Sequence, residues 1–181
     1  MELQNIQKEG KKYKEEVYAL YVEAFPEVER KPLELIETLS AQGKMEMLAI
    51  TENEEFLGLA INMMTGKTAL LDYFAIAPGR RGGGIGSRSL KLLLERFHNQ
   101  KYIFEIEKQD EQAENAAERK RRKEFYLRNG LKETGVFVNV YKTDFELLTP
   151  DGELNFEEYT EILYGILGEE GVRILEPRLL Q

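Results

Sequence analysis

A glycine-rich stretch, residues 77–87, holds the residues best suited to bind a ligand. Its glycines allow backbone N–H groups to turn toward one point, and the pattern places the stretch between a strand and a helix. Unpaired N–H groups and the dipole at a helix N-terminus attract phosphate, and Arg80 and Arg81 add positive charge. The sequence therefore predicts a phosphate-binding loop. The candidate N–H groups belong to Gly82, Gly83, Gly84, Ile85, Gly86 and Ser87.

Two known kinds of phosphate loop fit this stretch poorly. A P-loop needs Lys followed by Ser or Thr after its last glycine, and residues 85–87 are Ile-Gly-Ser. A dinucleotide-binding fingerprint could use Gly82 and Gly84, with Glu105 as the acid for the ribose, but Ser87 then stands at the third glycine position. A dinucleotide-binding enzyme stays open as a distant alternative.

Three carboxylates interrupt apolar strand patterns and are candidates for a general base. Asp72 lies within an apolar run at 69–77, and Glu105 and Glu107 share one face of the strand predicted at 101–107. Acids that converge on a pocket would bind an ammonium group, and one of them could accept its proton. A structural hydrogen bond for Asp72 and a solvated strand end for Glu107 are equally good interpretations. The sequence does not say which acid would be the base.

The composition of the chain excludes several classes of protein. With 181 residues, 42% hydrophobic and 32% charged, the chain is expected to form one globular domain. The absence of Cys rules out disulfides and a cysteine nucleophile, and a single His makes a metal site of several imidazoles improbable. The net charge of -8 argues against a nucleic-acid partner, and the basic run 119–123 fits an ion-paired helix face. No signal peptide or membrane span is evident, which predicts a cytoplasmic protein without a membrane partner.

The pattern of apolar residues predicts one domain with a mixed α/β sheet, in which three antiparallel strands precede a parallel strand-helix-strand unit. Pro26 is expected to end the first helix, Pro32 to lie in the first turn of the second, and Gly130 to cap the fourth. The predicted helices are 11–25, one that begins near Pro32, 85–98, 115–129 and 156–167. The predicted strands are 45–51, 55–64, 68–77, 101–107 and two within 131–148.

Two motifs resemble those of the GNAT superfamily of acyl-CoA-dependent N-acyltransferases. The family's pyrophosphate loop has Gln or Arg, two residues, Gly, one residue, then Gly or Ala, and Arg81, Gly84 and Gly86 match it. Residues 123–131 resemble the family's helix that ends in Phe-Tyr, three residues, Gly and an apolar residue. The order of elements over 11–148 is also similar, which leaves 150–181 as a C-terminal helical appendage to a single domain of 1–181.

The resemblance implies an N-acetyltransferase that uses acetyl-CoA as cosubstrate, without a metal. A primary amine of a small molecule or peptide would attack the thioester directly. Family geometry implies that the strand ending at Ile76 splays from the strand at 101–107, that pantetheine lies between them, and that the Ile76 N–H faces the thioester oxygen. Tyr126 resembles the acid that protonates the leaving thiolate. Many members carry Asn and Ala where this chain has Arg119 and Arg122.

The main alternative is a module of the same fold that binds acyl-CoA as a sensor or docking domain without turnover. The sequence leaves the acceptor amine and the oligomeric state open, including a homodimer.

Overall fold

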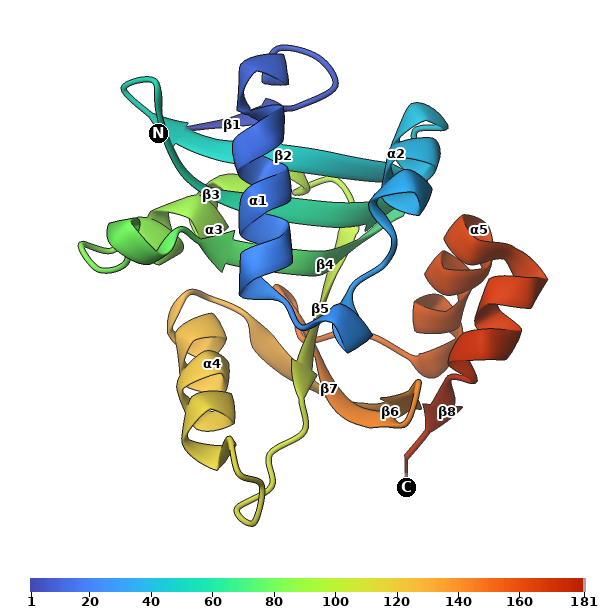
Figure 1. Cartoon of the computed structure of the whole chain (residues 1–181). Coiled ribbons are helices and arrows are strands. Elements are labelled where there is room, and N and C mark those ends of the chain that lie inside the picture. Colours follow the sequence, from blue (N-terminus) through green and yellow to red (C-terminus); the bar gives the residue numbers. More distant parts are fainter. Residues whose placement is uncertain (181) are drawn as a thin grey trace. The chain divides into compact units, whose positions relative to one another are not determined.

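The structure is a computed structural model that describes residues 1–180. The chain forms two compact units, and each is described by itself. The first contains residues 1–64 and 71–98, and the second contains residues 65–70 and the chain from residue 99 onward. Five α-helices and eight strands lie within residues 1–180, which confirms the predicted mixed α/β class (Figure 1).

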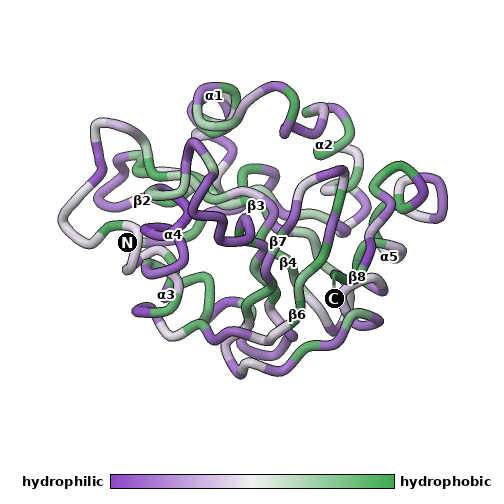
Figure 2. Tube along the Cα trace, turned by 90° about the horizontal axis from the view of Figure 1, so that it is seen from below, coloured by the Kyte–Doolittle hydropathy of each residue, from purple (hydrophilic) through white to green (hydrophobic). Residues whose placement is uncertain are grey.

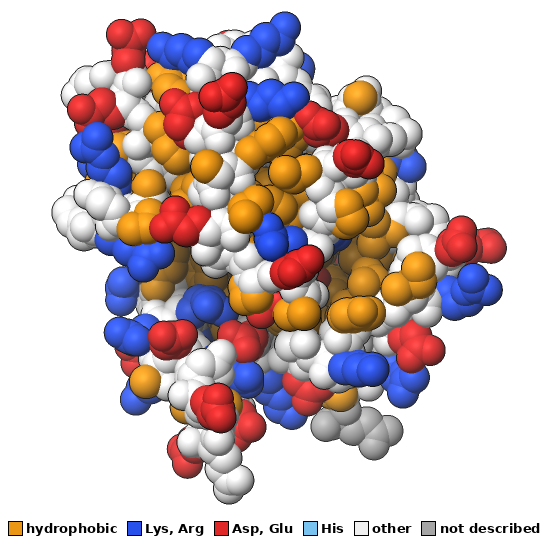
Figure 3. All heavy atoms as spheres, in the orientation of Figure 1, with side chains coloured by type: hydrophobic (Ala, Val, Ile, Leu, Met, Phe, Trp, Pro, Cys, Tyr) orange, Lys and Arg blue, Asp and Glu red, His pale blue; other side chains and the backbone are white. Residues whose placement is uncertain are grey.

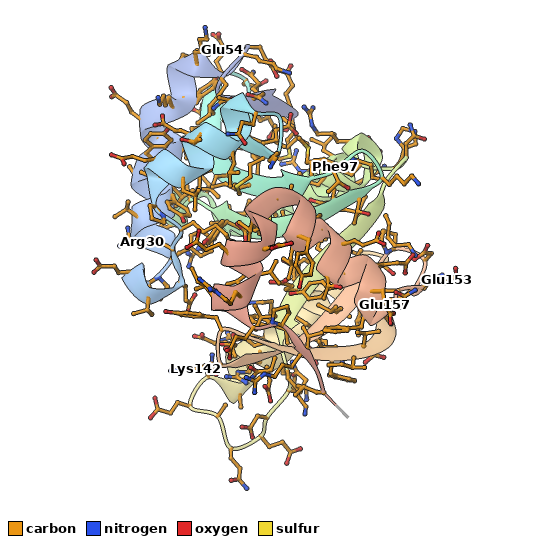
Figure 4. All side chains as sticks on the ribbon, turned by 90° about the vertical axis from the view of Figure 1, so that its right-hand side faces the viewer. Arg30, Glu54, Phe97, Lys142, Glu153 and Glu157 are labelled. Carbon is orange, nitrogen blue, oxygen red and sulfur yellow. The ribbon has the colours of Figure 1, made fainter. Side chains whose placement is uncertain are left out.

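The first unit is a sheet in the order β1-β2-β3-β4 with helices on both faces. Helices α1 and α2 cover one face of the sheet and α3 covers the other (Figures 1 and 4). This double cover explains why nearly every side chain of the two central strands is buried. The strands are β1 (Glu2–Asn5), β2 (Met45–Glu52), β3 (Glu55–Met64) and β4 (Thr68–Ile76), and the α-helices are α1 (Lys14–Ala24), α2 (Leu33–Ala41) and α3 (Ile85–Arg96).

Turn chemistry fixes the register of the β2-β3 hairpin. Asn53 and Glu54 both have positive φ, at 51° and 63°, which is the conformation of a tight two-residue hairpin turn. The two strands pair antiparallel, as predicted. Strand β1, which pairs antiparallel with β2, was not predicted. Its four residues, Glu-Leu-Gln-Asn, are too few and too polar to give a periodic signal.

The two prolines of the first unit act as helix boundaries. Helix α1 ends at Ala24, just before Pro26, and its predicted start at residue 11 is a short 3-10 turn, Lys11–Tyr13. Pro32 occupies the N-cap of α2 with a ψ of 133°, one residue outside the first-turn position predicted for it. Pro32 therefore precedes the first helical residue, Leu33, and its own backbone is extended.

The second unit is a sheet in the order β5-β7-β6-β8, to which the start of β4 adds an edge. Pairs β5-β7, β6-β7 and β6-β8 are antiparallel. Strands β4 and β5 are neighbours and run in the predicted parallel direction. Beside the start of β4, the Lys101 N–H donates to the Lys67 carbonyl over 2.9 Å. Its strands are β5 (Lys101–Glu107), β6 (Lys132–Val140), β7 (Thr143–Thr149) and β8 (Arg178–Leu179), and its helices are α4 (Ala116–Arg128) and α5 (Phe156–Leu175).

Over most of its length, β5 contacts a different helix on each face; Glu107, at its end, departs from this pattern and pairs with two arginines of α4. Phe104 packs on Tyr126 of α4 with ring centroids 5.5 Å apart. Lys101 and Glu105, which point to the opposite face by strand alternation, contact α5. Strand β5 therefore lies between α4 and α5 within this unit (Figure 1).

Helix α5 is longer than predicted. Asn155 and Glu158 form a reciprocal capping box at its start. At Gly168 the backbone leaves the helix (φ 69°, ψ -178°) and then resumes it as far as Leu175. The prediction stopped at residue 167 because a glycine normally ends a helical pattern. No helix within residues 1–180 is long and apolar enough to cross a membrane.

Candidate functional site

The glycine loop of the first unit leads from the end of β4 into α3. Gly82, Gly83 and Gly84 have φ values of 100°, 59° and 72°, a left-handed region that other residues enter only with strain. Gly84 is the N-cap of α3, so no side chain caps the first turn of this helix. The Ile85 N–H, one of the predicted donors, already donates to the Gly82 carbonyl over 3.3 Å, so the Gly86 and Ser87 N–H groups of the first turn are the better placed to bind a phosphate.

The end of β4 next to this loop is held by close backbone packing. A Cβ added to Gly58 of β3 would lie 2.4 Å from the Ala75 carbonyl oxygen, so only glycine lets the two strands come this close. The Ala77 N–H donates to the Leu57 carbonyl at the same place, over 2.9 Å. These contacts fix the backbone of Ile76, which was predicted to face the thioester oxygen.

The two arginines of the loop have partners inside the first unit. The Arg81 Nε donates to the Ile76 carbonyl over 3.4 Å, and the Arg80 guanidinium lies 2.8 Å from a Glu55 carboxylate oxygen. Both arginines remain exposed. Their positive charge therefore stays available to an anion in the loop.

Tyr126 lies in the last turn of α4, where the helix end fixes its backbone. Gly130 has a φ of 95° and donates to the Leu127 carbonyl, and the Leu131 N–H donates to the Tyr126 carbonyl over 3.2 Å. This pair of bonds is a Schellman motif, which confirms the predicted capping role of Gly130. The glycine that follows the Phe-Tyr pair thus holds the Tyr126 backbone in place.

The Tyr126 side chain is buried between aromatic rings. Its ring packs on Phe104 of β5 and Phe125 of its own helix, and only 8% of the residue is exposed. Burial raises the pKa of Tyr126 to about 12, and the positive charge of Arg122, one turn earlier on α4, opposes this rise. The phenol therefore carries its proton at neutral pH and could donate it.

Asp72, on β4 in the first unit, is paired with a lysine. Lys31 Nζ lies 2.8 Å and 2.9 Å from its two carboxylate oxygens. Lys31 sits in the connection between α1 and α2, beside Arg30, which Figure 4 labels. The hydroxyl of Tyr73 accepts from the Lys31 N–H and donates to the Glu29 carbonyl. Asp72 and Tyr73 therefore fasten this connection to the sheet.

Replacing Asp72 with Asn is expected to lower the free energy of unfolding by about 1–3 kcal/mol, because Lys31 loses its counter-charge in a site where it is only 22% exposed. The double variant Lys31→Met/Asp72→Leu should recover most of that loss. Urea unfolding measures both. The matched control is Glu54→Gln, whose partner Lys12 is exposed. If the double variant is stable but inactive, Asp72 has a chemical role beyond this pairing.

Glu107 lies at the end of β5 within a cluster of donors from the region of α4. Its oxygens lie 3.1 Å from Arg119 Nη2 and 2.9 Å from Arg122 Nη1, and the Asn115 amide donates to it. Arg119 also donates to the Lys108 carbonyl. The two arginines that stand where many GNAT members have Asn and Ala thus share one carboxylate.

Arg119, Arg122 and Lys123 of the basic run at 119–123 are ion-paired, as predicted for this helix face, but their partners are carboxylates of neighbouring strands and not of the helix itself. Lys123 binds the carboxylates of Glu133 and Glu146 from the two neighbouring strands. Helix α4 is drawn mostly in the hydrophilic colour in Figure 2, and acidic and basic side chains alternate over it in Figure 3. Acidic and basic side chains are therefore mixed on and around α4.

Glu105 has a partner that the sequence did not indicate. The Tyr159 hydroxyl of α5 donates to Glu105 Oε1 over 2.6 Å, and Tyr159 is fully buried. Its spacing from Ile162, Leu163 and Ile166 marks it as part of the apolar face of α5. That signal could have predicted its burial, but nothing in the sequence pairs it with a particular strand residue.

The candidate residues fall into two groups by unit. The first unit holds the loop (Ile76, Arg81, Gly82, Gly83, Gly84, Ile85, Gly86 and Ser87) together with Asp72, and the second holds Tyr126, Glu105 and Glu107. The assignment of these residues to a site stays a prediction. Within residues 1–180, no group of three His, Cys, Asp or Glu side chains is placed to hold a metal ion.

Comparison with known proteins gives consistent results. The sequence model of the acetyltransferase (GNAT) family matches residues 14–122. A solved structure from Bacteroides thetaiotaomicron, assigned to the GNAT family of acetyltransferases, has a TM-score of 0.73 and 24% identity, over 93% of this chain and 99% of that one. The search of curated proteins returned no match.

Two further solved structures share the fold. An aminoglycoside 6'-N-acetyltransferase complexed with coenzyme A has a TM-score of 0.62 and 18% identity, over 82% of this chain and 96% of that one. The ribosomal-protein-S18-alanine N-acetyltransferase of Escherichia coli has a TM-score of 0.57 and 18% identity, over 86% of this chain and 96% of that one.

Proposed function

The chain belongs to the GNAT family of acetyltransferases, and from this premise we propose that it transfers an acetyl group from acetyl-CoA to a primary amine of a small molecule or peptide. The observation that carries the proposal is the loop at 82–84, in which three consecutive glycines with positive φ open onto the uncapped start of α3. This loop would hold the pyrophosphate of acetyl-CoA. The match of the family model, which includes the loop, supports this role.

The reaction requires an acid and a base in addition to the loop that would bind the pyrophosphate. The amine nitrogen attacks the thioester carbon, the C–S bond breaks, and the thiolate takes a proton from the Tyr126 phenol. The ammonium proton passes to a carboxylate, for which Asp72, Glu105 and Glu107 are the candidates. The Ile76 N–H would donate to the oxyanion that forms at the carbonyl.

The structural neighbours indicate which classes of acceptor are worth testing. One neighbour acetylates an aminoglycoside and another a ribosomal protein, and all of these acceptors are amines. The chain itself carries 33 acidic and 25 basic side chains. This excess of acidic side chains favours a cationic acceptor, and the acidic candidate bases favour a small cationic amine.

One observation favours a second function, a sensor that binds acyl-CoA without turnover. Each of the three candidate bases already accepts a hydrogen bond or ion pair from another side chain: Asp72 from Lys31, Glu105 from Tyr159, and Glu107 from two arginines. In a sensor, these carboxylates would be structural. The two functions differ in whether free CoA is released.

The test is release of free CoA from acetyl-CoA in the presence of a panel of primary amines. Because the chain contains no Cys, a thiol reagent reports only the CoA that is released. We expect release that depends on one class of amine and that yields an acetylated product by mass spectrometry. Acetyl-CoA binding with no release across polyamines, aminoglycosides, amino acids and peptides would favour the sensor.

A further inference from the structure

We infer that Arg80 and Arg88, at the two ends of the glycine loop, form a second anion site that binds the 3'-phosphate of CoA. This phosphate is a monoester on the ribose, separate from the pyrophosphate. The inference rests on the proposed function, in which backbone N–H groups of the loop bind the pyrophosphate. It adds Arg88, which the sequence did not single out, and makes the third phosphate of the cosubstrate a determinant of specificity.

The first argument is the placement of the two arginines around the loop. Arg80 precedes the three glycines with positive φ, and the Arg88 N–H, in α3, donates to the Gly84 carbonyl over 3.0 Å. The Cα–Cβ bonds of a helix tilt toward its N-terminus, so the Arg88 side chain leaves α3 in the direction of the loop. The side chains of Arg80 and Arg88 are 44% and 48% exposed. Both guanidinium groups are therefore accessible to an anionic ligand of the loop.

The second argument is that one structure, the end of the β2-β3 hairpin, holds both arginines. Arg88 binds the two carboxylate oxygens of Glu52 over 2.6 Å and 3.2 Å, and Arg80 lies 2.8 Å from an oxygen of Glu55. Glu52 and Glu55 are directly opposite each other in the register of the hairpin, on either side of the turn that contains Glu54, labelled in Figure 4. The two guanidinium groups are therefore brought to the same place from opposite ends of the loop.

The third argument is that a phosphate can replace these carboxylates. Like charges directly opposite each other in a sheet are destabilising, and the two arginines supply the counter-charges that Glu52 and Glu55 need. Exposed ion pairs of this kind contribute little to stability. A phosphate monoester carries about two negative charges at neutral pH, and a guanidinium group binds its oxygens in a bidentate manner. The phosphate is therefore the stronger partner for the arginines.

The fourth argument is the charge at the start of α3. Acidic side chains stabilise a helix N-terminus, and α1, α2, α4 and α5 each have at least one in the first turn. Among the α-helices within residues 1–180, only α3 has none, and its fourth residue is Arg88. The chain as a whole has a net charge of -8. The start of α3 thus departs from the acidic character of the chain in the direction that favours an anion.

The test compares CoA with 3'-dephospho-CoA, which lacks only the third phosphate, by calorimetric titration. The unaltered chain should bind CoA at least about tenfold more tightly than 3'-dephospho-CoA. The variant Arg80→Gln/Arg88→Gln should lose at least about tenfold in affinity for CoA and less than about threefold for 3'-dephospho-CoA. The two changes remove the same interaction, one from the protein and one from the ligand, so their effects should not add.

A second comparison separates phosphate binding from a purely structural role of the ion pairs. Arg88→Gln and Glu52→Gln break the same pair. Arg88→Gln should weaken CoA binding about fivefold or more, because a phosphate ligand is lost. Glu52→Gln should bind CoA at least as tightly as the unaltered chain, because the competing carboxylate is lost. The matched control is Lys12→Gln, whose partner Glu54 lies in the same hairpin, and it should change the affinity less than about twofold.

Several outcomes would overturn the inference. One is an unchanged affinity for CoA in the double arginine variant, or an equal loss for both ligands. Another is a loss in Glu52→Gln as large as that in Arg88→Gln, which would show that the pair only stabilises the loop. If the unaltered chain binds neither ligand, the proposed function fails together with this inference. If it binds both with equal affinity, the proposed function stands and this inference alone is overturned.

Discussion

Replacing Tyr126 with Phe is expected to lower kcat by about 10²–10⁴-fold, the range that general acid catalysis contributes. The leaving thiolate would then have no positioned proton donor. The ring keeps its packing against Phe104 and Phe125, so the fold and the affinity for acetyl-CoA should not change. Stopped-flow release of free CoA measures the rate, and calorimetric titration with acetyl-CoA measures the affinity.

The pH dependence of the unaltered chain checks the same assignment. Because burial raises the pKa of Tyr126 to about 12, the phenol stays protonated as the pH rises from neutral to about 10. We therefore expect no alkaline loss of kcat from this group below about pH 10.

The matched control for Tyr126→Phe is Tyr141→Phe, at an exposed position of the β6-β7 turn, which should leave kcat unchanged. Unchanged kcat in Tyr126→Phe would contradict the assignment of Tyr126 as the acid.

Replacing Gly82, Gly83 and Gly84 together with Ala is expected to weaken acetyl-CoA binding by at least about a hundredfold. Each alanine would have to adopt a left-handed backbone, at a cost of roughly 1–2 kcal/mol per residue, or the loop would have to rearrange. No atom lies within 4 Å of a Cβ added at these three positions, so the unliganded fold has room for the methyl groups. The loss should therefore appear in the dissociation constant.

Gly79→Ala is the matched control for the triple variant. Gly79 lies in the same loop, a Cβ there also meets open space, and its φ is outside the left-handed region. The affinity of Gly79→Ala for acetyl-CoA should stay within about twofold of the unaltered chain. Unimpaired binding by the triple variant would show that the glycine backbone does not cradle the cosubstrate.

The parts of the fold that the sequence predicts well are those set by local chemistry. The β2-β3 hairpin follows from two polar residues between apolar strands, and the end of α4 follows from Gly130. Strand β5 was predicted at its observed bounds, 101–107, because aromatic residues and isoleucines, which favour strands, make up its centre. In each case a few neighbouring residues determine the structure.

The parts that escaped prediction depend on contacts between distant residues. Strand β1 is a strand only because β2 offers it an edge, and β8 is two residues that pair with β6. The partners of the candidate acids show the same limit. Lys31 lies 41 residues from Asp72, and Tyr159 lies 54 residues from Glu105. Spacing along one strand or helix carries no information on such pairs.

The central claim is that this chain binds acetyl-CoA through its glycine loop, and thermal unfolding with acetyl-CoA, CoA and NAD tests it most directly. A ligand at about 100 times its dissociation constant adds roughly 2.7 kcal/mol to the free energy of unfolding. We predict a clear rise in Tm with acetyl-CoA and with CoA, none with NAD, and loss of that rise in the triple glycine variant. No shift with either CoA species at millimolar concentration, or a shift with NAD instead, would contradict the account.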